Sequence, residues 1–209
     1  EVHHAGDDRA WGESVREAFA QARTRLSLSG TPFRSDTLAI PFVPYDDEGL
    51  ATPDIEYGYA EALGDGPIQS FLSQQARQHG LWLIGGTLPL RAATPERARN
   101  ACCVYAPDGA LAARYDKIHL FRFETDRESY DEARVLEAGS QPAAVQAGAL
   151  RVGLSICYDL RFPELYRALC TPPCDVLSVP AAFTYTTGRA HWELLLRARA
   201  IENQCVVLA

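Results

Sequence analysis

One cysteine of the sequence stands where its thiol could act as a nucleophile. Cys157 directly follows the short apolar run 151–156, and a helix with Pro163 near its start is predicted a few residues later. A side chain at a strand-to-helix turn is exposed at the edge of a sheet, close to backbone N–H groups that can stabilise an oxyanion. In isolation, however, a cysteine that closes a strand is more often a buried structural thiol.

A thiol attacks well only as a thiolate, so Cys157 needs a base or a positively charged neighbour. Lys117 is a candidate for the positive charge, because it follows a strand-like run, 111–115, and precedes an apolar stretch that starts at Ile118. By itself, a lysine in such a place is more often a solvated surface residue. Neither segment alone indicates a catalytic site, and the hypothesis depends on their occurring together.

Together, the motifs resemble those of the nitrilase superfamily of carbon–nitrogen hydrolases. The two longest are Tyr115-Asp116-Lys117-Ile118-His119-Leu120-Phe121 and Cys157-Tyr158-Asp159-Leu160-Arg161-Phe162-Pro163-Glu164. Shorter pieces follow the order of the family, at 65–68, 85–87, 99–100, 180–183 and 191–204. The similarity covers residues 60–209 and is greatest to the amidase branch that includes omega-amidase and deaminated-glutathione amidase. Several separate motifs in a fixed order make a chance resemblance improbable.

The resemblance implies a role for each of the matching residues. Cys157 would attack the carbon of an amide or a nitrile, form a thioester or thioimidate and release ammonia or an amine, and an amide is the favoured substrate. Lys117 and the backbone N–H of Tyr158 would stabilise the oxyanion. Glu132 matches the second glutamate of the family, which positions the base and the lysine; alone it would be taken for a surface carboxylate. The implied partner is a small-molecule amide, and the chemistry requires neither a metal nor an organic cofactor. The residues predicted to bind the substrate are Tyr158, Phe183 and Tyr185.

The sequence departs from the family at the general base, which is the glutamate of a Pro-Glu pair at the end of an early strand. Here Pro41 is followed by Phe42. The nearest carboxylates come several residues later, at Asp46, Asp47 and Glu48. Loss of a general base typically lowers the rate by 10²–10⁴-fold. Two hypotheses therefore stay open: an active amidase, and a catalytically impaired or inactive homologue that acts as a binding or scaffold module.

The predicted helices and strands alternate, which indicates an α/β fold. The resemblance implies a four-layer α-β-β-α sandwich. We expect the fold to be truncated at the C-terminus, with residues 1–59 as an atypical N-terminal segment, 60–209 as a partial hydrolase domain, and a homodimer as the assembly. The predicted helices are 65–79, 162–169 and 191–203, and the predicted strands are 81–85, 101–105, 111–115, 150–156, 175–179 and 205–208.

Composition excludes several other classes of protein. The formal net charge of −7 argues against a nucleic-acid partner, whose phosphates require a positive face. No apolar run approaches the roughly 18 residues that a membrane span needs, and residues 1–8 lack the features of a signal peptide, so we expect a cytoplasmic protein. Cys170 and Cys174 lack the second pair of ligands that a zinc site requires. Cys102 and Cys103 should point to opposite faces of one strand.

Overall fold

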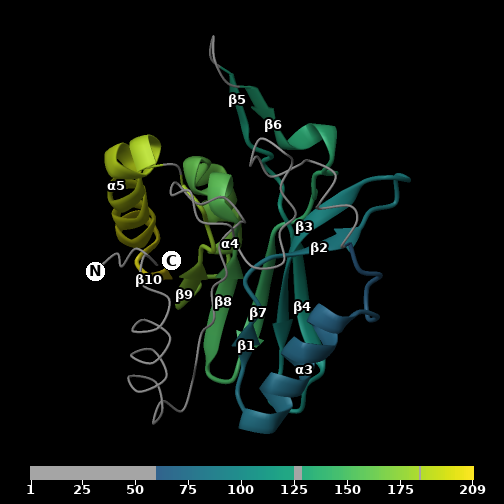
Figure 1. Cartoon of the computed structure of the whole chain (residues 1–209). Helices are drawn as coiled ribbons and strands as arrows, with labels where there is room; N and C mark the ends of the chain where they lie inside the picture. Colours follow the sequence, from purple (N-terminus) through teal and green to yellow (C-terminus); the bar gives the residue numbers. More distant parts are fainter. Residues whose placement is uncertain (1–59, 125–128, 184) are drawn as a thin grey trace, which may run out of the picture.

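The computed structural model describes residues 60–124, 129–183 and 185–209 (Figure 1). The predicted N-terminal segment 1–59 and the carboxylates at 46–48 lie outside these residues. The described part contains two four-stranded sheets and a short separate hairpin. Helix α3 lies on one side of the two sheets, and helices α4 and α5 lie on the other (Figure 1). The expected α-β-β-α order of layers is therefore present.

The first sheet is built around a long central strand, β3 (Ala98–Tyr105). It pairs antiparallel with β1 (Leu83–Ile84), β2 (Leu88–Arg91) and β4 (Leu111–Asp116). Helix α3 (Pro67–His79) begins with proline in its first turn and ends at Gly80, whose φ of 60° places it in the left-handed region. Both residues suit these positions, because proline needs no N–H partner there and glycine pays no steric penalty. The predicted helix and the hairpin over 101–115 are confirmed.

The second sheet has the strand order β10-β9-β8-β7. β7 (Ala143–Ala147) and β8 (Leu150–Leu154) form an antiparallel hairpin, whereas β8, β9 (Val176–Ser178) and β10 (Val206–Leu208) run parallel. Parallel neighbours need a crossover connection, usually a helix. Here the crossovers are α4 (Pro163–Leu169) and α5 (Tyr185–Asn203), and a 3₁₀ helix, η2 (Cys157–Arg161), precedes α4.

A small hairpin projects from the upper end of the molecule in Figure 1. It consists of β5 (Arg122–Glu124) and β6 (Ser129–Asp131), which pair antiparallel. The 3₁₀ helix η1 (Glu132–Arg134) follows directly, and the Asp131 side chain caps it by accepting a hydrogen bond from Ala133 N at 2.9 Å. This cap is a preferred arrangement at a helix start, and it fixes the position of Glu132.

The buried apolar side chains form separate clusters, as stacked layers require. One cluster joins the facing sides of the two sheets and extends to helix α4, with Cys102, Tyr115, Leu154 and Leu177 among its members. A second lies between α3 and the first sheet and includes Cys103. Adjacent strand residues point to opposite faces. The prediction that Cys102 and Cys103 face opposite ways is therefore confirmed.

Helix α5 and several short strands differ from the expectations drawn from the sequence. Helix α5 starts at Tyr185, six residues before the predicted start at His191, because the helix runs through Thr186, Thr187 and Gly188. Threonine and glycine have low helix propensity, so the helical signal at these residues is weak. Strands β2, β5, β6 and β7 were not predicted, and each is five residues long or shorter, which leaves little room for a periodic pattern.

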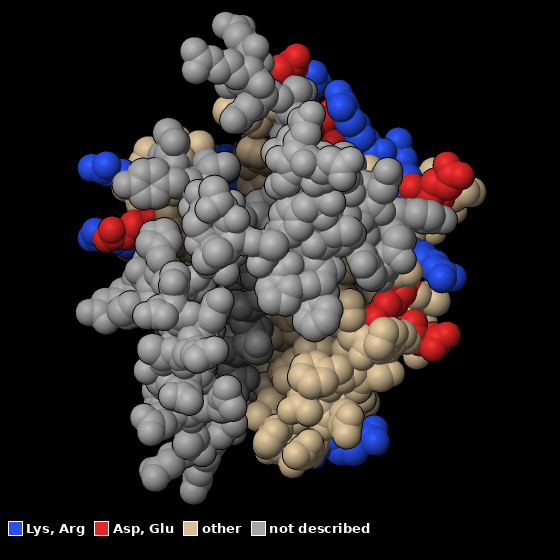
Figure 2. Space-filling view, viewed as in Figure 1, with Lys and Arg blue, Asp and Glu red and all other residues tan. Residues whose placement is uncertain are grey.

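Two further findings on the described residues concern membranes and nucleic acids as partners. None of the helices in this part of the chain combines the length and apolar character that crossing a membrane requires. Among the described residues on the face that Figure 2 shows, Lys and Arg alternate with Asp and Glu along one edge. This pattern does not form the one-sign positive surface that nucleic acids select.

We predict that Gly139→Ala destabilises the fold, because the Gly139 backbone packs directly on β4. Its N–H donates to Lys117 O at 2.8 Å, and a Cβ at this position would overlap the backbone carbonyl of Asp116. Overpacking of this kind typically costs about 1–3 kcal/mol. The measurement is urea unfolding. Gly188→Ala is the matched control: its Cβ would lie 3.4 Å from Phe183 Cβ, inside helix α5, so unchanged or slightly higher stability is expected.

Candidate active site

Cys157 lies shortly after strand β8 of the second sheet and is the first residue of the 3₁₀ helix η2. Beyond the end of β8, Ser155 N donates to Ser178 O at 3.1 Å and Cys157 N donates to Pro180 O at 2.9 Å. Cys157 itself has a φ of 48°, in the left-handed region that residues other than glycine seldom adopt. Such a conformation persists only when the surrounding structure fixes it, and it is frequent at functional sites. The predicted strand-to-helix turn is thus present, with a constrained cysteine at its centre.

Lys117 and Glu132 form a buried ion pair. The Lys117 ammonium donates to both oxygens of the Glu132 carboxylate, at 2.8 and 2.6 Å. Only 1% of Lys117 and 5% of Glu132 is exposed. Phe121 N donates to Glu132 Oε2 at 2.7 Å, and Lys117 N extends the β3–β4 pairing by donating to Asn100 O at 2.9 Å. Neither residue is the solvated surface group that its local sequence suggests.

The Cys157 thiol is within electrostatic reach of this pair. Burial raises the pKa of Cys157, the Lys117 ammonium opposes that rise, and the carboxylates of Glu132 and Asp159 add to it. The thiol also donates a hydrogen bond to Ala182 O, at 3.8 Å. The three residues predicted to be catalytic therefore come together. Because the net shift of the pKa is upward, the thiol is protonated at neutral pH, and nucleophilic attack requires a group that accepts its proton.

Asp159 is a central residue of the site that the sequence did not single out. Its side chain is fully buried and accepts hydrogen bonds from Tyr115 Oη at 2.7 Å and from Ile156 N at 2.9 Å. It also accepts from His119 N at 3.0 Å and from His119 Nδ1 at 2.7 Å. The signal in the sequence was an acid two residues after Cys157, inside the motif that carries the resemblance.

The predicted substrate-binding residue Tyr158 lies in an aromatic group beside Cys157. Its ring meets Phe121 edge-on at 5.3 Å and Phe162 edge-on at 5.4 Å between centroids. Phe162 in turn stacks on the His119 ring, with centroids 3.6 Å apart and the planes inclined by 7°. These contacts link η2 to the loop that follows β4, and Tyr158 is half-buried among them.

Arg161 joins this aromatic group to helix α5. Its guanidinium lies 5.8 Å from the ring centre of Tyr158 and 5.4 Å from that of Phe183, distances at which a cation interacts with a ring face. It also donates to His191 Nδ1, at 3.3 Å from one terminal nitrogen. Among the described residues, no carboxylate lies within salt-bridge distance of Arg161.

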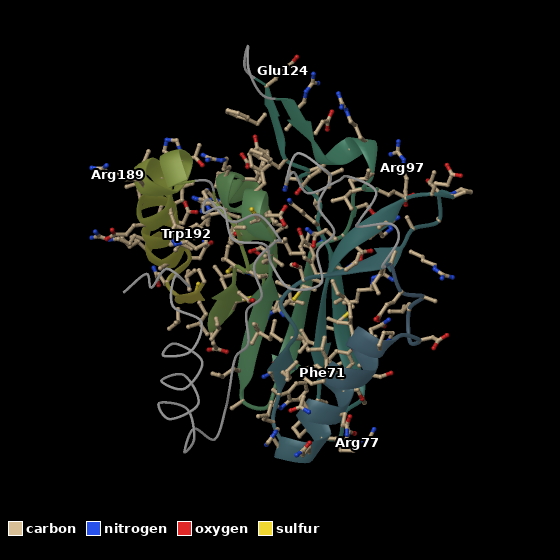
Figure 3. The ribbon with its side chains drawn as sticks, viewed as in Figure 1. Phe71, Arg77, Arg97, Glu124, Arg189 and Trp192 are labelled. Atoms are coloured by element: carbon tan, nitrogen blue, oxygen red, sulfur yellow. The ribbon has the colours of Figure 1, made fainter. Side chains whose placement is uncertain are left out.

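Phe183, the second predicted substrate-binding residue, packs against Trp192 with ring centroids 4.7 Å apart. Trp192 is on α5 (Figure 3), among the residues that pack against the main core. Tyr185, the third predicted residue, begins α5, and its side chain lies outside the described part. Glu193 and Arg197 form an ion pair one helical turn apart, at 3.8 Å and well exposed. In the described ranges, no three His, Cys, Asp or Glu side chains are arranged to hold a metal ion.

Comparison with known proteins identifies the family of the chain. The model of the carbon-nitrogen hydrolase family matches residues 40–209. The chain is 42% identical over 201 residues to a deaminated glutathione amidase of Yersinia enterocolitica, covering 95% of this chain and 68% of that protein. It is 41% identical over 150 residues to the omega-amidase NIT2 of Homo sapiens, covering 71% of this chain and 53% of that protein.

A solved structure supports the same assignment. Nit3 of Saccharomyces cerevisiae, a member of branch 10 of the nitrilase superfamily, superposes with a TM-score of 0.72 at 28% identity. The superposition covers 96% of this chain and 67% of that structure. The four-layer fold, the order of the motifs and the family match all agree: the chain belongs to the carbon–nitrogen hydrolase family, within the nitrilase superfamily.

Proposed function

We propose that this chain is an amidase that hydrolyses a small amide to a carboxylate and ammonia through a covalent thioester on Cys157. One observation carries the proposal: a constrained, half-buried cysteine lies within the field of a buried Lys117–Glu132 pair. Lys117 is only 1% exposed, and burying its charge is costly unless a partner of opposite charge compensates it, as Glu132 does here. Its ammonium is suited to stabilise negative charge that develops beside the thiol.

The proposed reaction uses these groups in two stages. The Cys157 sulfur attacks the amide carbon after losing its proton, and the carbonyl oxygen becomes an oxyanion. Lys117 and the backbone N–H of Tyr158 stabilise that oxyanion, and one such donor contributes roughly 3–4 kcal/mol in comparable sites. The carbon–nitrogen bond then breaks, the nitrogen leaves as ammonia with the transferred proton, and a thioester remains. Water hydrolyses the thioester and restores the thiol.

The proton acceptor for Cys157 stays a prediction. The carboxylates at 46–48, which the sequence offers in place of the glutamate of the family, lie outside the described residues. Within the described part, Glu132 and Asp159 are the carboxylates that act on the pKa of Cys157, and both already accept several hydrogen bonds. The role proposed for Glu132 is therefore to hold Lys117, whose ammonium donates to both of its oxygens.

A small amide that carries a carboxylate is the substrate class that we propose. Arg161 supports this choice, because its guanidinium borders Tyr158 and Phe183 without a carboxylate partner in the described residues. Guanidinium groups bind carboxylates through two parallel hydrogen bonds. The direct test is to incubate the purified chain with alpha-ketoglutaramate and measure ammonia. Absence of both ammonia and an acyl adduct on Cys157 would overturn the proposal.

We predict that Arg161→Met raises KM for a carboxylate-bearing amide by about 10–100-fold, since a hydrogen bond to a charged group contributes roughly 1.5–3 kcal/mol. The turnover of a neutral amide of the same size should change little. Steady-state kinetics with both substrates provide the measurement. Arg197→Met is the matched control, because Arg197 lies exposed on α5 and pairs only weakly with Glu193. Equal losses for both amides would show that Arg161 does not select the carboxylate.

The alternative, a non-catalytic homologue that serves as a binding or scaffold module, gains no support from the relatives described above, which are named as amidases. The homodimer expected from the resemblance stays a proposal, and size-exclusion chromatography with light scattering tests it.

A further inference from the structure

Most of the hydrogen bonds that Asp159 accepts from described residues cross between the two sheets. Tyr115 belongs to β4 of the first sheet, and His119 lies three residues beyond the end of that strand. Asp159 belongs to η2, which extends the second sheet, as does Ile156 just before it. Three of the four donors to this carboxylate, Tyr115 Oη, His119 N and His119 Nδ1, therefore come from the opposite sheet.

These bonds flank the two residues proposed to react. Lys117 lies midway between Tyr115 and His119 in the chain, and Cys157 lies between Ile156 and Asp159. Each oxygen of Asp159 has a distinct set of donors: Oδ1 accepts both bonds from His119, and Oδ2 accepts those from Tyr115 and Ile156. One carboxylate thus holds the segments on both sides of Lys117 against the turn that carries Cys157.

We propose that Asp159 is a positioning residue that sets the separation of the Lys117 ammonium from the Cys157 sulfur. The inference rests on the proposed function, in which these two groups act on the same substrate carbonyl. Apolar packing joins the same two sheets through Cys102, Tyr115 and Leu154. Apolar burial has no preferred direction, whereas hydrogen bonds of 2.7–3.0 Å fix direction and length.

The surroundings of Asp159 suit a fixed carboxylate. A buried charge is tolerated when hydrogen bonds satisfy its oxygens, and here four donors do so. The pKa of Tyr115 is raised by burial and by the Asp159 carboxylate, so the phenol stays protonated and remains a donor. His119 Nδ1 must carry its proton to donate to Asp159, and the stacking on Phe162 holds the ring in that orientation.

The test is a double-mutant cycle that follows alkylation of Cys157 by iodoacetamide as a function of pH. Because the Lys117 ammonium lowers the pKa of Cys157, Lys117→Met should move the alkylation profile to higher pH. In an Asp159→Asn background the same substitution should move it much less, since the ammonium is no longer held beside the sulfur. A shift of equal size in both backgrounds would overturn the inference.

Turnover provides a second readout, beside the alkylation of Cys157. Asp159→Asn removes a carboxylate that raises the pKa of Cys157, but it also releases the Lys117 ammonium, whose lowering effect on that pKa is larger. Asp159→Asn alone should therefore slow alkylation at neutral pH, and its kcat should fall at least about 10-fold, because misplacement by about 1 Å can cost 10². Asp116→Asn is the matched control: Asp116 precedes Lys117 but pairs with Arg114, and it should leave both readouts unchanged.

Two further results keep the inference distinct from the proposed function. If the natural chain releases no ammonia, the proposed function fails, while the alkylation cycle still reports on Asp159. If Asp159→Asn does not fold, Tyr115→Phe replaces it in the cycle, because it removes one cross-sheet hydrogen bond and no charge. Tyr115→Phe should then reduce the effect of Lys117→Met in part, and an undiminished effect would contradict the inference.

Discussion

Replacing Cys157 by alanine is expected to reduce ammonia release at least about 10³-fold, since removing a nucleophile from a catalytic unit costs this much or more. The fold should survive, because the backbone at φ 48° is as accessible to alanine as to cysteine, and the thiol's hydrogen bond within the described residues is a single long one, to Ala182 O. The measurement pairs kcat with thermal unfolding. Mass spectrometry of the natural chain during turnover should show the acyl group on Cys157.

Cys170→Ala is the control for this experiment. Cys170 is also a half-buried free cysteine, but it lies at the end of α4, away from the Lys117–Glu132 pair. Its replacement should leave ammonia release within about twofold of the natural rate. Undiminished activity in Cys157→Ala, or an acyl group found on another cysteine, would show that the nucleophile has been misassigned.

Lys117→Met is expected to lower both stability and activity, because it leaves the Glu132 carboxylate buried with Phe121 N as its remaining donor among the described residues. Removing one partner of a buried ion pair typically costs about 3–5 kcal/mol. The loss of an oxyanion donor should lower kcat by roughly 10²–10³-fold. Urea unfolding measures the first effect, and steady-state ammonia release measures the second.

The double variant Lys117→Met/Glu132→Gln separates the two effects. Removing the second charge should restore part of the lost stability, since no uncompensated ion remains, whereas activity should stay low. Arg197→Met breaks the exposed Glu193–Arg197 pair and should change stability by less than about 1 kcal/mol. Recovery of activity together with stability in the double variant would show that Lys117 has only a structural role.

Much of the fold could be predicted because its signals are local. Pro67 and Gly80 delimit α3, and the turn at 107–109 separates β3 from β4, so the boundaries follow from backbone conformations that few residues favour. The start of α5 was missed because Thr186, Thr187 and Gly188 are poor helix formers, and their helical state depends on the packing of α5 against the second sheet.

The sequence by itself determined the family, the order of its motifs, and the identity of Cys157, Lys117 and Glu132 as candidates. It did not determine that Lys117 and Glu132 would be buried as an ion pair, or that Asp159 would bond to Tyr115, 44 residues away. Those contacts arise only when the two sheets stack, since hydrogen bonds and ion pairs depend on separations in space rather than along the chain. The tertiary structure therefore decided the electrostatic setting of Cys157, whose pKa reflects burial, one ammonium and two carboxylates from three separate segments.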